Sequence, residues 1–182
     1  MAAKYSFQLR STDRRRELPH KIIVGQRETE TEAQVLLKLF GYLLFYSPRL
    51  QLEPRLHDDN NPYQPDLIEL DYELRPTLWV ECGDCSLEKL DRLAVKVPEA
   101  ALWVVRRSAG EAEQLLRRMT KAELRRDRYR IISVDEGMFE EAASLMRSRN
   151  EIVWVRGEFD PPNLQFDFNG LWFDAPFQVW TF

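Results

Sequence analysis

The fold is decided by residues 60–90, which read N-N-P-Y-Q-P-D-L-I-E-L-D-Y-E-L-R-P-T-L-W-V-E-C-G-D-C-S-L-E-K-L. It contains two short apolar runs, Leu67–Leu74 and Leu78–Val80, separated by Arg75–Thr77. Short apolar runs on either side of a proline-containing break are typical of neighbouring strands joined by a tight turn. We therefore expect two paired strands at the centre of the fold.

Two carboxylates stand at the ends of these strands, Asp66 near the start of the first and Glu81 at the end of the second. Side chains alternate along a strand, so Asp66 shares a face with an apolar series: Ile68, Leu70, Tyr72 and Leu74. A carboxylate directed toward a core needs a proton, a base or a metal ion as partner. Solvent exposure at the strand ends is the alternative.

Length and composition indicate one globular domain, residues 1–182, because 182 residues with 44% apolar content can bury a sizeable core. Without a run of 18 apolar residues or a charged-then-apolar leader, we expect no membrane span and no secretion. Two cysteines and no leader favour a cytoplasmic location with reduced thiols. The net charge of −4 does not suggest a general coat for nucleic acid.

A helix is predicted over Thr29–Tyr46, where apolar residues recur at helical spacing and Ser47 and Pro48 follow. Thr29 and Glu32 have the spacing of a capping box. Glu30 lies on the apolar stripe, so it is a third carboxylate that could face inward. A favourable charge near the helix N-terminus explains Glu30 equally well.

A second helix is predicted at Ser86–Lys96, with Lys89, Arg92 and Lys96 as a basic stripe. Strands are predicted at Lys4–Arg10, Lys21–Val24, Arg49–Leu56, Ala100–Val105 and Tyr129–Val134, and further helices at Glu111–Met119 and Asp135–Met146. The C-terminal part has strand patterns at Glu151–Arg156, Leu164–Phe168, Leu171–Phe173 and Phe177–Phe182. Asn169 and Gly170 predict a type I′ hairpin between two of them.

The order helix, three strands, helix, strand over residues 29–105 resembles the core of the PD-(D/E)xK phosphodiesterase superfamily, and more narrowly the YaeQ family. The resemblance is carried by E-T-E at 30–32, L-L-K-L-F-G-Y-L at 36–43, P-R-L-Q-L at 48–52, P-D at 65–66, L-W-V-E-C-G at 78–83 and L-E-K-L at 87–90. It implies an α/β (α+β) fold, with a mixed sheet flanked by helices. Residues 151–182 would add a β-rich C-terminal extension.

The resemblance also implies a Mg²⁺- or Mn²⁺-dependent phosphodiesterase, a nuclease acting on nucleic acid. The metal would be held by Asp66, Glu81 and the backbone carbonyl of Cys82, since Mg²⁺ prefers oxygen ligands. Glu30 would complete the pocket from the first helix. Hydrolysis would then use water activated by the cation.

One position departs from the superfamily pattern. The superfamily lysine belongs two residues after the second acid, and this chain has Gly83 there. In some members the basic residue lies on the next helix, which makes Lys89 the catalytic candidate and Arg92 the second choice. If neither reaches the acids, the chain is a catalytically degenerate nucleic-acid- or protein-binding module on the same fold.

Other functions fit single motifs. Cys82 and Cys85 have the C-x-x-C spacing of a redox motif, and a zinc site would also need both histidines, His20 and His57. The basic segments Arg14–Arg16 and Arg117–Arg130 could contact a polyanion. Aromatic residues at 164–182 could form a protein interface, although core packing is the commoner use.

Overall fold

The structure, a computed structural model, describes residues 3–57 and 61–182, so Asn60 at the start of the opening stretch lies outside the described residues. The elements in chain order are β1 Lys4–Ser11, β2 Lys21–Gly25, α1 Glu32–Phe45, β3 Gln51–Leu52, β4 Leu67–Leu70, β5 Pro76–Cys82, α2 Leu87–Lys96, β6 Ala101–Arg106, α3 Ala109–Lys121, β7 Tyr129–Ser133, α4 Glu136–Ser144, β8 Arg149–Phe159, β9 Pro162–Phe168, β10 Leu171–Pro176 and β11 Gln178–Thr181.

These strands form two mixed sheets. One has six strands in the order β11-β7-β6-β5-β4-β3, with β5, β6 and β7 parallel and the other pairs antiparallel. The other has five in the order β10-β9-β8-β1-β2, in which β1 and β8 are parallel. The fold is therefore a mixed α+β fold, as predicted.

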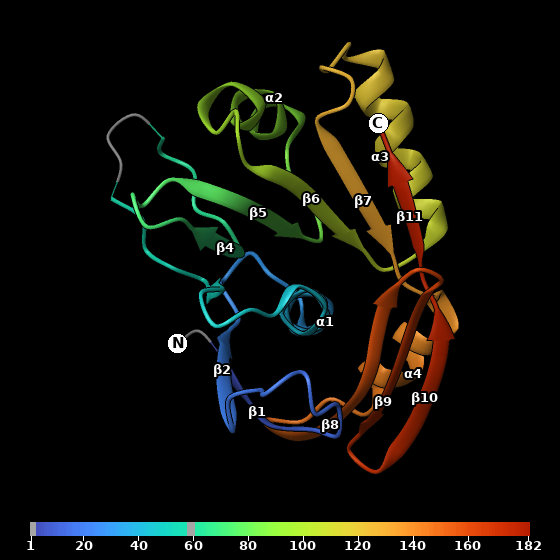
Figure 1. Cartoon of the computed structure of the whole chain (residues 1–182). Helices are drawn as coiled ribbons and strands as arrows, with labels where there is room; N and C mark the ends of the chain where they lie inside the picture. Colours follow the sequence, from blue (N-terminus) through green and yellow to red (C-terminus); the bar gives the residue numbers. More distant parts are fainter. Residues whose placement is uncertain (1–2, 58–60) are drawn as a thin grey trace.

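Helix α1 lies between the two sheets (Figure 1). Every residue from Val35 to Leu44 is buried, including Lys38, because a helix with a sheet on each side has no solvent-facing stripe. Helices α2 and α3 contribute Leu90, Leu93 and Leu115 to a second core on the other face of the six-stranded sheet. The order of layers places the ends of β4 and β5 beside α1.

Strands β4 and β5 are antiparallel neighbours, with Leu67 opposite Val80, which confirms the predicted pair. The predicted turn position is wrong. The turn spans Asp71–Arg75, where the Asp71 carboxylate accepts hydrogen bonds from the N–H groups of residues 73 and 75. Tyr72 and Leu74 are consequently 94% and 75% exposed instead of lying on the core face. The predicted strand Arg49–Leu56 shortens to β3.

The start of α1 also differs from the prediction. Thr31 is the N-cap and forms its capping box with Gln34, not Thr29 with Glu32. The Glu32 carboxylate instead accepts a hydrogen bond of 2.6 Å from the Tyr5 hydroxyl. Glu30 therefore precedes the helix, although its side chain is only 7% exposed.

The C-terminal strands complete both sheets. Strand β8 pairs with β1, and β11 pairs with β7, so residues 151–182 are integral to the fold and not only packed against it. The hairpin between β9 and β10 is confirmed, with φ of 51° at Asn169 and 88° at Gly170. The buried aromatic residues of this part are Trp154, Phe166, Phe168, Phe173, Phe177 and Phe182. Core packing thus accounts for most of the aromatic residues that could have formed an interface.

Candidate functional site

Buried Glu81 and partly buried Lys89 form an ion pair at the end of β5. The Lys89 ammonium lies 2.7 Å from the Glu81 carboxylate and also donates to the backbone carbonyl of Gln64 at 2.9 Å. The indole N–H of Trp79 donates to the same carboxylate at 2.7 Å. Helix α2 therefore brings Lys89, the candidate that the resemblance implied, into contact with the second acid.

Asp66 occupies the next position in the register that pairs Leu67 with Val80, which places it beside Glu81. Its Oδ2 accepts the N–H of Cys82 at 2.8 Å. Its Oδ1 faces α1, at 3.7 Å from Lys38 Nζ and 3.8 Å from Arg27 Nη1. Asp66 thus connects the Glu81 pair to a second group of charges.

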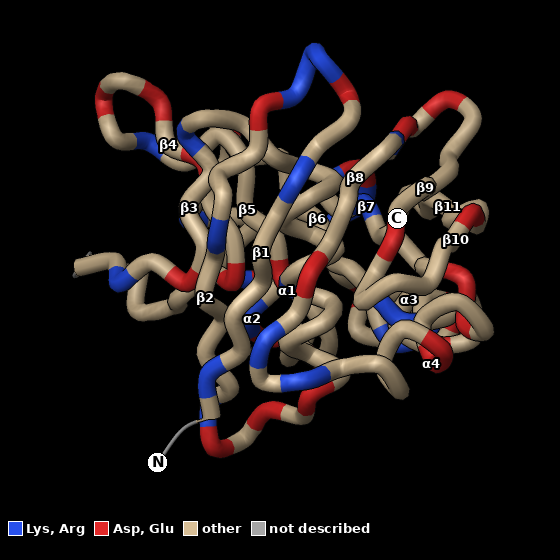
Figure 2. Tube along the Cα trace, turned by 90° about the horizontal axis from the view of Figure 1, so that it is seen from below, with Lys and Arg blue, Asp and Glu red and all other residues tan. Residues whose placement is uncertain are grey.

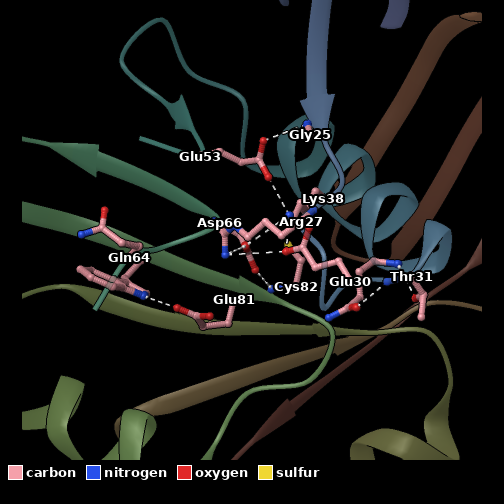
Figure 3. Close-up of polar contacts among 12 residues, drawn as sticks. Gly25, Arg27, Glu30, Thr31, Lys38, Glu53, Gln64, Asp66, Glu81 and Cys82 are labelled. Atoms are coloured by element: carbon pink, nitrogen blue, oxygen red, sulfur yellow. Dashed lines mark hydrogen bonds and ion pairs between the residues drawn. The ribbon is translucent and has the colours of Figure 1, made fainter. Parts of the chain in front are cut away.

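That second group is centred on Lys38, whose side chain is fully buried. Its ammonium donates to Glu30 at 2.6 Å and to Glu53 at 2.7 Å. In Figure 3, Lys38, Arg27 and Glu30 gather beside Asp66, whereas the Glu81 carboxylate points away from them. Glu30 and Asp66 therefore lie on either side of the Lys38 ammonium.

Burial shifts the titration of these groups. It raises the pKa of Glu81 to about 7; Lys89 opposes that shift and the Asp66 charge adds to it. Burial also raises the pKa of Asp66, against the opposing charge of Lys38 and the Cys82 N–H. Burial alone would lower the pKa of Lys38, but the charge of Asp66 and the hydrogen bonds that Lys38 donates to Glu30 and Glu53 raise it. Lys38 therefore stays charged, whereas Asp66 and Glu81 hold a proton more readily than usual.

The conformation of Gly83 disfavours any side chain at this position. Gly83 has φ of +91°, and a Cβ at this position would lie 2.9 Å from Cγ of Gln34. A residue with a side chain is therefore disfavoured by the positive φ and also by the close approach of its Cβ to Gln34. Lys89 approaches from the opposite face, on α2.

Neither cysteine has the setting of a redox thiol. Both are free, Cys82 is buried and Cys85 is half-buried. Burial raises the pKa of Cys82 well above its ordinary value and that of Cys85 to about 12. Reactive thiols need a lowered pKa, so this geometry does not favour redox chemistry.

The other basic candidates are partly used in packing. Arg92 pairs with Glu88 at 3.5 Å and does not contact the acids. Arg16 donates to the Leu43 carbonyl, and Arg128 donates to two backbone carbonyls. Figure 2 shows Lys and Arg interspersed with Asp and Glu over the outer face of β1, β2 and β8. The two basic segments therefore do not combine into one uniformly basic face in this view.

Oxygen donors of the kind that Mg²⁺ prefers are present at the strand ends, but each is already paired. Over residues 3–57 and 61–182, no three His, Cys, Asp or Glu side chains are placed to share a metal ion. Four carboxylates, from Glu30, Glu53, Asp66 and Glu81, adjoin three cations, from Arg27, Lys38 and Lys89. The donor chemistry fits a hard cation, which would have to replace a proton or an ammonium.

Sequence reasoning missed Lys38, Glu53 and Arg27. A signal for Lys38 was visible, since it interrupts the otherwise uncharged run Val35–Leu44 of a buried helix. A buried lysine requires an anionic partner, and Glu30 lies two turns earlier. Glu53 gave no comparable signal, because the pairing of β3 with β4 brings it to Lys38.

Two mixed sheets around a buried helix, with an acid–lysine cluster at the strand ends, define the chain as a mixed α+β protein. The family model described as YaeQ protein matches residues 1–155. The chain belongs to the YaeQ family. The structure is similar to the YaeQ protein from Pseudomonas syringae, with a TM-score of 0.73 and 18% identity over 100% of this chain and 97% of that one.

A second solved structure, the YaeQ protein from Xanthomonas axonopodis pv. citri, gives a TM-score of 0.68 at 19% identity, over 99% of this chain and 97% of that one. No curated protein matches the sequence. At these identities the two likenesses show the fold. None of the described helices is both long and apolar enough to cross a membrane.

Proposed function

We propose that the chain is a Mg²⁺- or Mn²⁺-dependent phosphodiesterase, a nuclease acting on nucleic acid. The observation that carries the proposal is the 2.7 Å contact of Lys89 with Glu81, next to Asp66. The resemblance to the PD-(D/E)xK superfamily requires two acids on adjacent strands and a lysine beside them. Here α2 supplies the lysine that position 83 cannot hold.

Asp66, Glu81 and the backbone carbonyl of Cys82 would hold the cation, with Glu30 completing the acidic side of the site. A bound divalent cation supplies Lewis-acid activation of water and offsets phosphate charge. Lys89 holds a positive charge close to the acids, where it would orient the water and stabilise the negative charge that develops during hydrolysis.

A second function is favoured by one observation, that every carboxylate of the site already has a cationic partner. A site neutralised by its own lysines could bind nucleic acid or protein without cleaving it. The alternative is therefore a catalytically degenerate binding module on the same fold.

Cleavage of plasmid and single-stranded DNA separates the two. Wild-type protein is incubated in EDTA, Mg²⁺ or Mn²⁺, together with Asp66→Asn, Glu81→Gln and Lys89→Met. Glu113→Gln, on the exposed face of α3, is the matched control. A nuclease gives metal-dependent cleavage that the first three variants abolish and the control retains. Absence of cleavage by the wild type with either ion contradicts the enzyme, and cleavage that survives Asp66→Asn contradicts the site.

A further inference from the structure

A cleft of about 670 Å³ opens beside the acid–lysine cluster, between the end of β2 and the segment that follows β3. Three basic side chains line it, Arg27, Arg55 and His57. Glu53 and Gln64 also line it. The cleft therefore joins exposed basic groups to residues that belong to the site.

Arg27 links the cleft to the acids. Its Nη1 lies 3.7 Å from Glu30 and 3.8 Å from Asp66, and its side chain is 47% exposed. Both distances exceed that of a hydrogen bond. These contacts therefore hold the guanidinium near the acids while leaving its N–H groups able to donate to an anion.

Among the described residues that line the cleft, Glu53 is the one acid, and its charge is already compensated. Its Oε1 accepts from Lys38 at 2.7 Å and its Oε2 accepts from the Gly25 N–H at 3.0 Å. Because a buried lysine offsets the charge of Glu53, the described lining of the cleft places little negative charge opposite Arg27 and Arg55. Its lining suits an anion better than a cation.

Gln64 fixes the opposite wall. Its side-chain amide makes two hydrogen bonds to the backbone of Leu56, at 2.8 and 2.9 Å. Its backbone carbonyl accepts from Lys89, the partner of Glu81. Arg27 therefore connects one wall of the cleft to Asp66, and Lys89 connects the other wall, at Gln64, to Glu81.

We propose that this cleft binds the backbone phosphates of a single nucleic-acid strand, with Arg27 and Arg55 as the phosphate contacts. Guanidinium groups bind phosphate through paired N–H donors. A phosphate held by Arg27 lies next to Asp66, where the hydrolysis proposed above would take place. The substrate class rests on that proposed function, but the position of the strand rests on the cleft.

Fluorescence anisotropy of a short labelled single-stranded DNA, measured in EDTA, tests binding without cleavage. Arg27→Met combined with Arg55→Met should weaken binding about tenfold. The slope of log affinity against log salt should fall by about 1.4, because each phosphate contact on a single strand contributes about 0.7. The matched control removes equal charge from the β1–β2 loop, Arg14→Met with Arg15→Met, and should stay within twofold of wild type.

Arg55→Met alone leaves the acid cluster untouched, so it keeps the test valid if the double variant is unstable; it should weaken binding severalfold and lower the slope by about 0.7. An equal loss in the loop control would place the strand on that loop and overturn the cleft. Displacement by inorganic phosphate at equal phosphate concentration would reduce the cleft to a small-anion site and overturn it too. Failure of the wild type to bind the DNA also overturns the proposed strand binding in the cleft. Binding without cleavage contradicts only the proposed phosphodiesterase activity.

Discussion

The ammonium of Lys38 lies 2.6 Å from the Glu30 carboxylate and 2.7 Å from that of Glu53, inside a helix that has no exposed face between Val35 and Leu44. A fully buried lysine of this kind is costly unless its charge is matched. The carboxylates have the same requirement. The charge of Lys38 therefore allows the carboxylates of Glu30, Glu53 and Asp66 to lie close to one another despite their mutual repulsion.

Replacing Lys38 with Met should destabilise the protein by about 3–5 kcal/mol, because breaking a buried pair leaves uncompensated charge behind. Denaturant unfolding measures the loss. Lys4→Met, at an exposed position of β1, removes the same charge and should cost less than about 0.5 kcal/mol. A loss at Lys38 as small as that of the control would show that the acids are solvated or protonated without it.

Placing a lysine at position 83 should not increase the proposed cleavage activity. Gly83→Lys places a side chain at φ of +91° and against Gln34, so we expect a loss of stability and no gain in cleavage. Gly170→Lys is the matched control, since Gly170 has φ of +88° and no described atom within 4 Å of a Cβ there. The control isolates backbone strain of about 1–2 kcal/mol, and Gly83→Lys should cost clearly more.

Equal losses of stability in Gly83→Lys and Gly170→Lys would show that the contact with Gln34 adds nothing to the backbone strain. Increased cleavage by Gly83→Lys would show that position 83 can hold a lysine. The comparison uses thermal and denaturant unfolding of both variants, with cleavage measured on the same preparations.

Stability should fall as pH rises toward neutrality because of Glu81. Its pKa is raised from 4.5 to about 7 in the folded protein, so between those values the folded state binds more protons than the unfolded chain. That contribution is fully present below pH 4.5 and is lost as pH rises to about 7. A difference of one between the folded and unfolded pKa corresponds to about 1.4 kcal/mol of stability.

Unfolding free energies measured from pH 5 to 8 test this. Glu81→Gln, which cannot ionise, should flatten the decline, whereas Glu113→Gln should retain it. The contrary result is an unfolding free energy of the wild type that stays constant with pH, or that rises by the same amount in wild type and both variants. Glu81 would then be ionised in the folded state at every pH tested.

The cysteines should be chemically inert in the native protein. Because burial raises the pKa of Cys82 and Cys85, little thiolate is available at pH 8. Iodoacetamide should modify neither residue in the native state and both after unfolding in guanidinium, as intact mass shows. The double replacement with Ser should leave metal response and cleavage unchanged, and rapid native alkylation of Cys85 would be the contrary result.

Most elements of the fold could be predicted from sequence because local patterns specify them. The β4–β5 pair, the helix capped by Ser86 and the Asn169–Gly170 hairpin each depend on residues close together in the chain. The parallel pairing of β1 with β8 does not. It joins residues separated by more than a hundred positions, and no local pattern specifies such a contact.

The same distinction applies to the site. Lys89 was a candidate because the resemblance places a basic residue on the helix after the second acid, and its contact with Glu81 joins residues only eight positions apart. Alternation wrongly extended the first strand to Leu74, since the Asp71 carboxylate ends it with a turn. The Lys38–Glu53 contact depends on tertiary packing of α1 against the segment after β3, which periodicity does not encode.

The remaining prediction concerns the cation itself. If Asp66 and Glu81 hold Mn²⁺, binding to the folded state alone stabilises it by mass action, by about 2.7 kcal/mol at a hundredfold excess over Kd. Thermal unfolding of wild type should therefore shift upward with Mn²⁺, and the shift should disappear in Asp66→Asn and Glu81→Gln. Without metal, both variants should be no less stable than wild type near pH 7.5, because each removes a buried charge with a raised pKa. Glu113→Gln should keep the full response. A shift that persists in both site variants would place the ion elsewhere. No shift in wild type would mean that these acids pair with Arg27, Lys38 and Lys89 and not with a metal ion, and would leave the binding module as the better description.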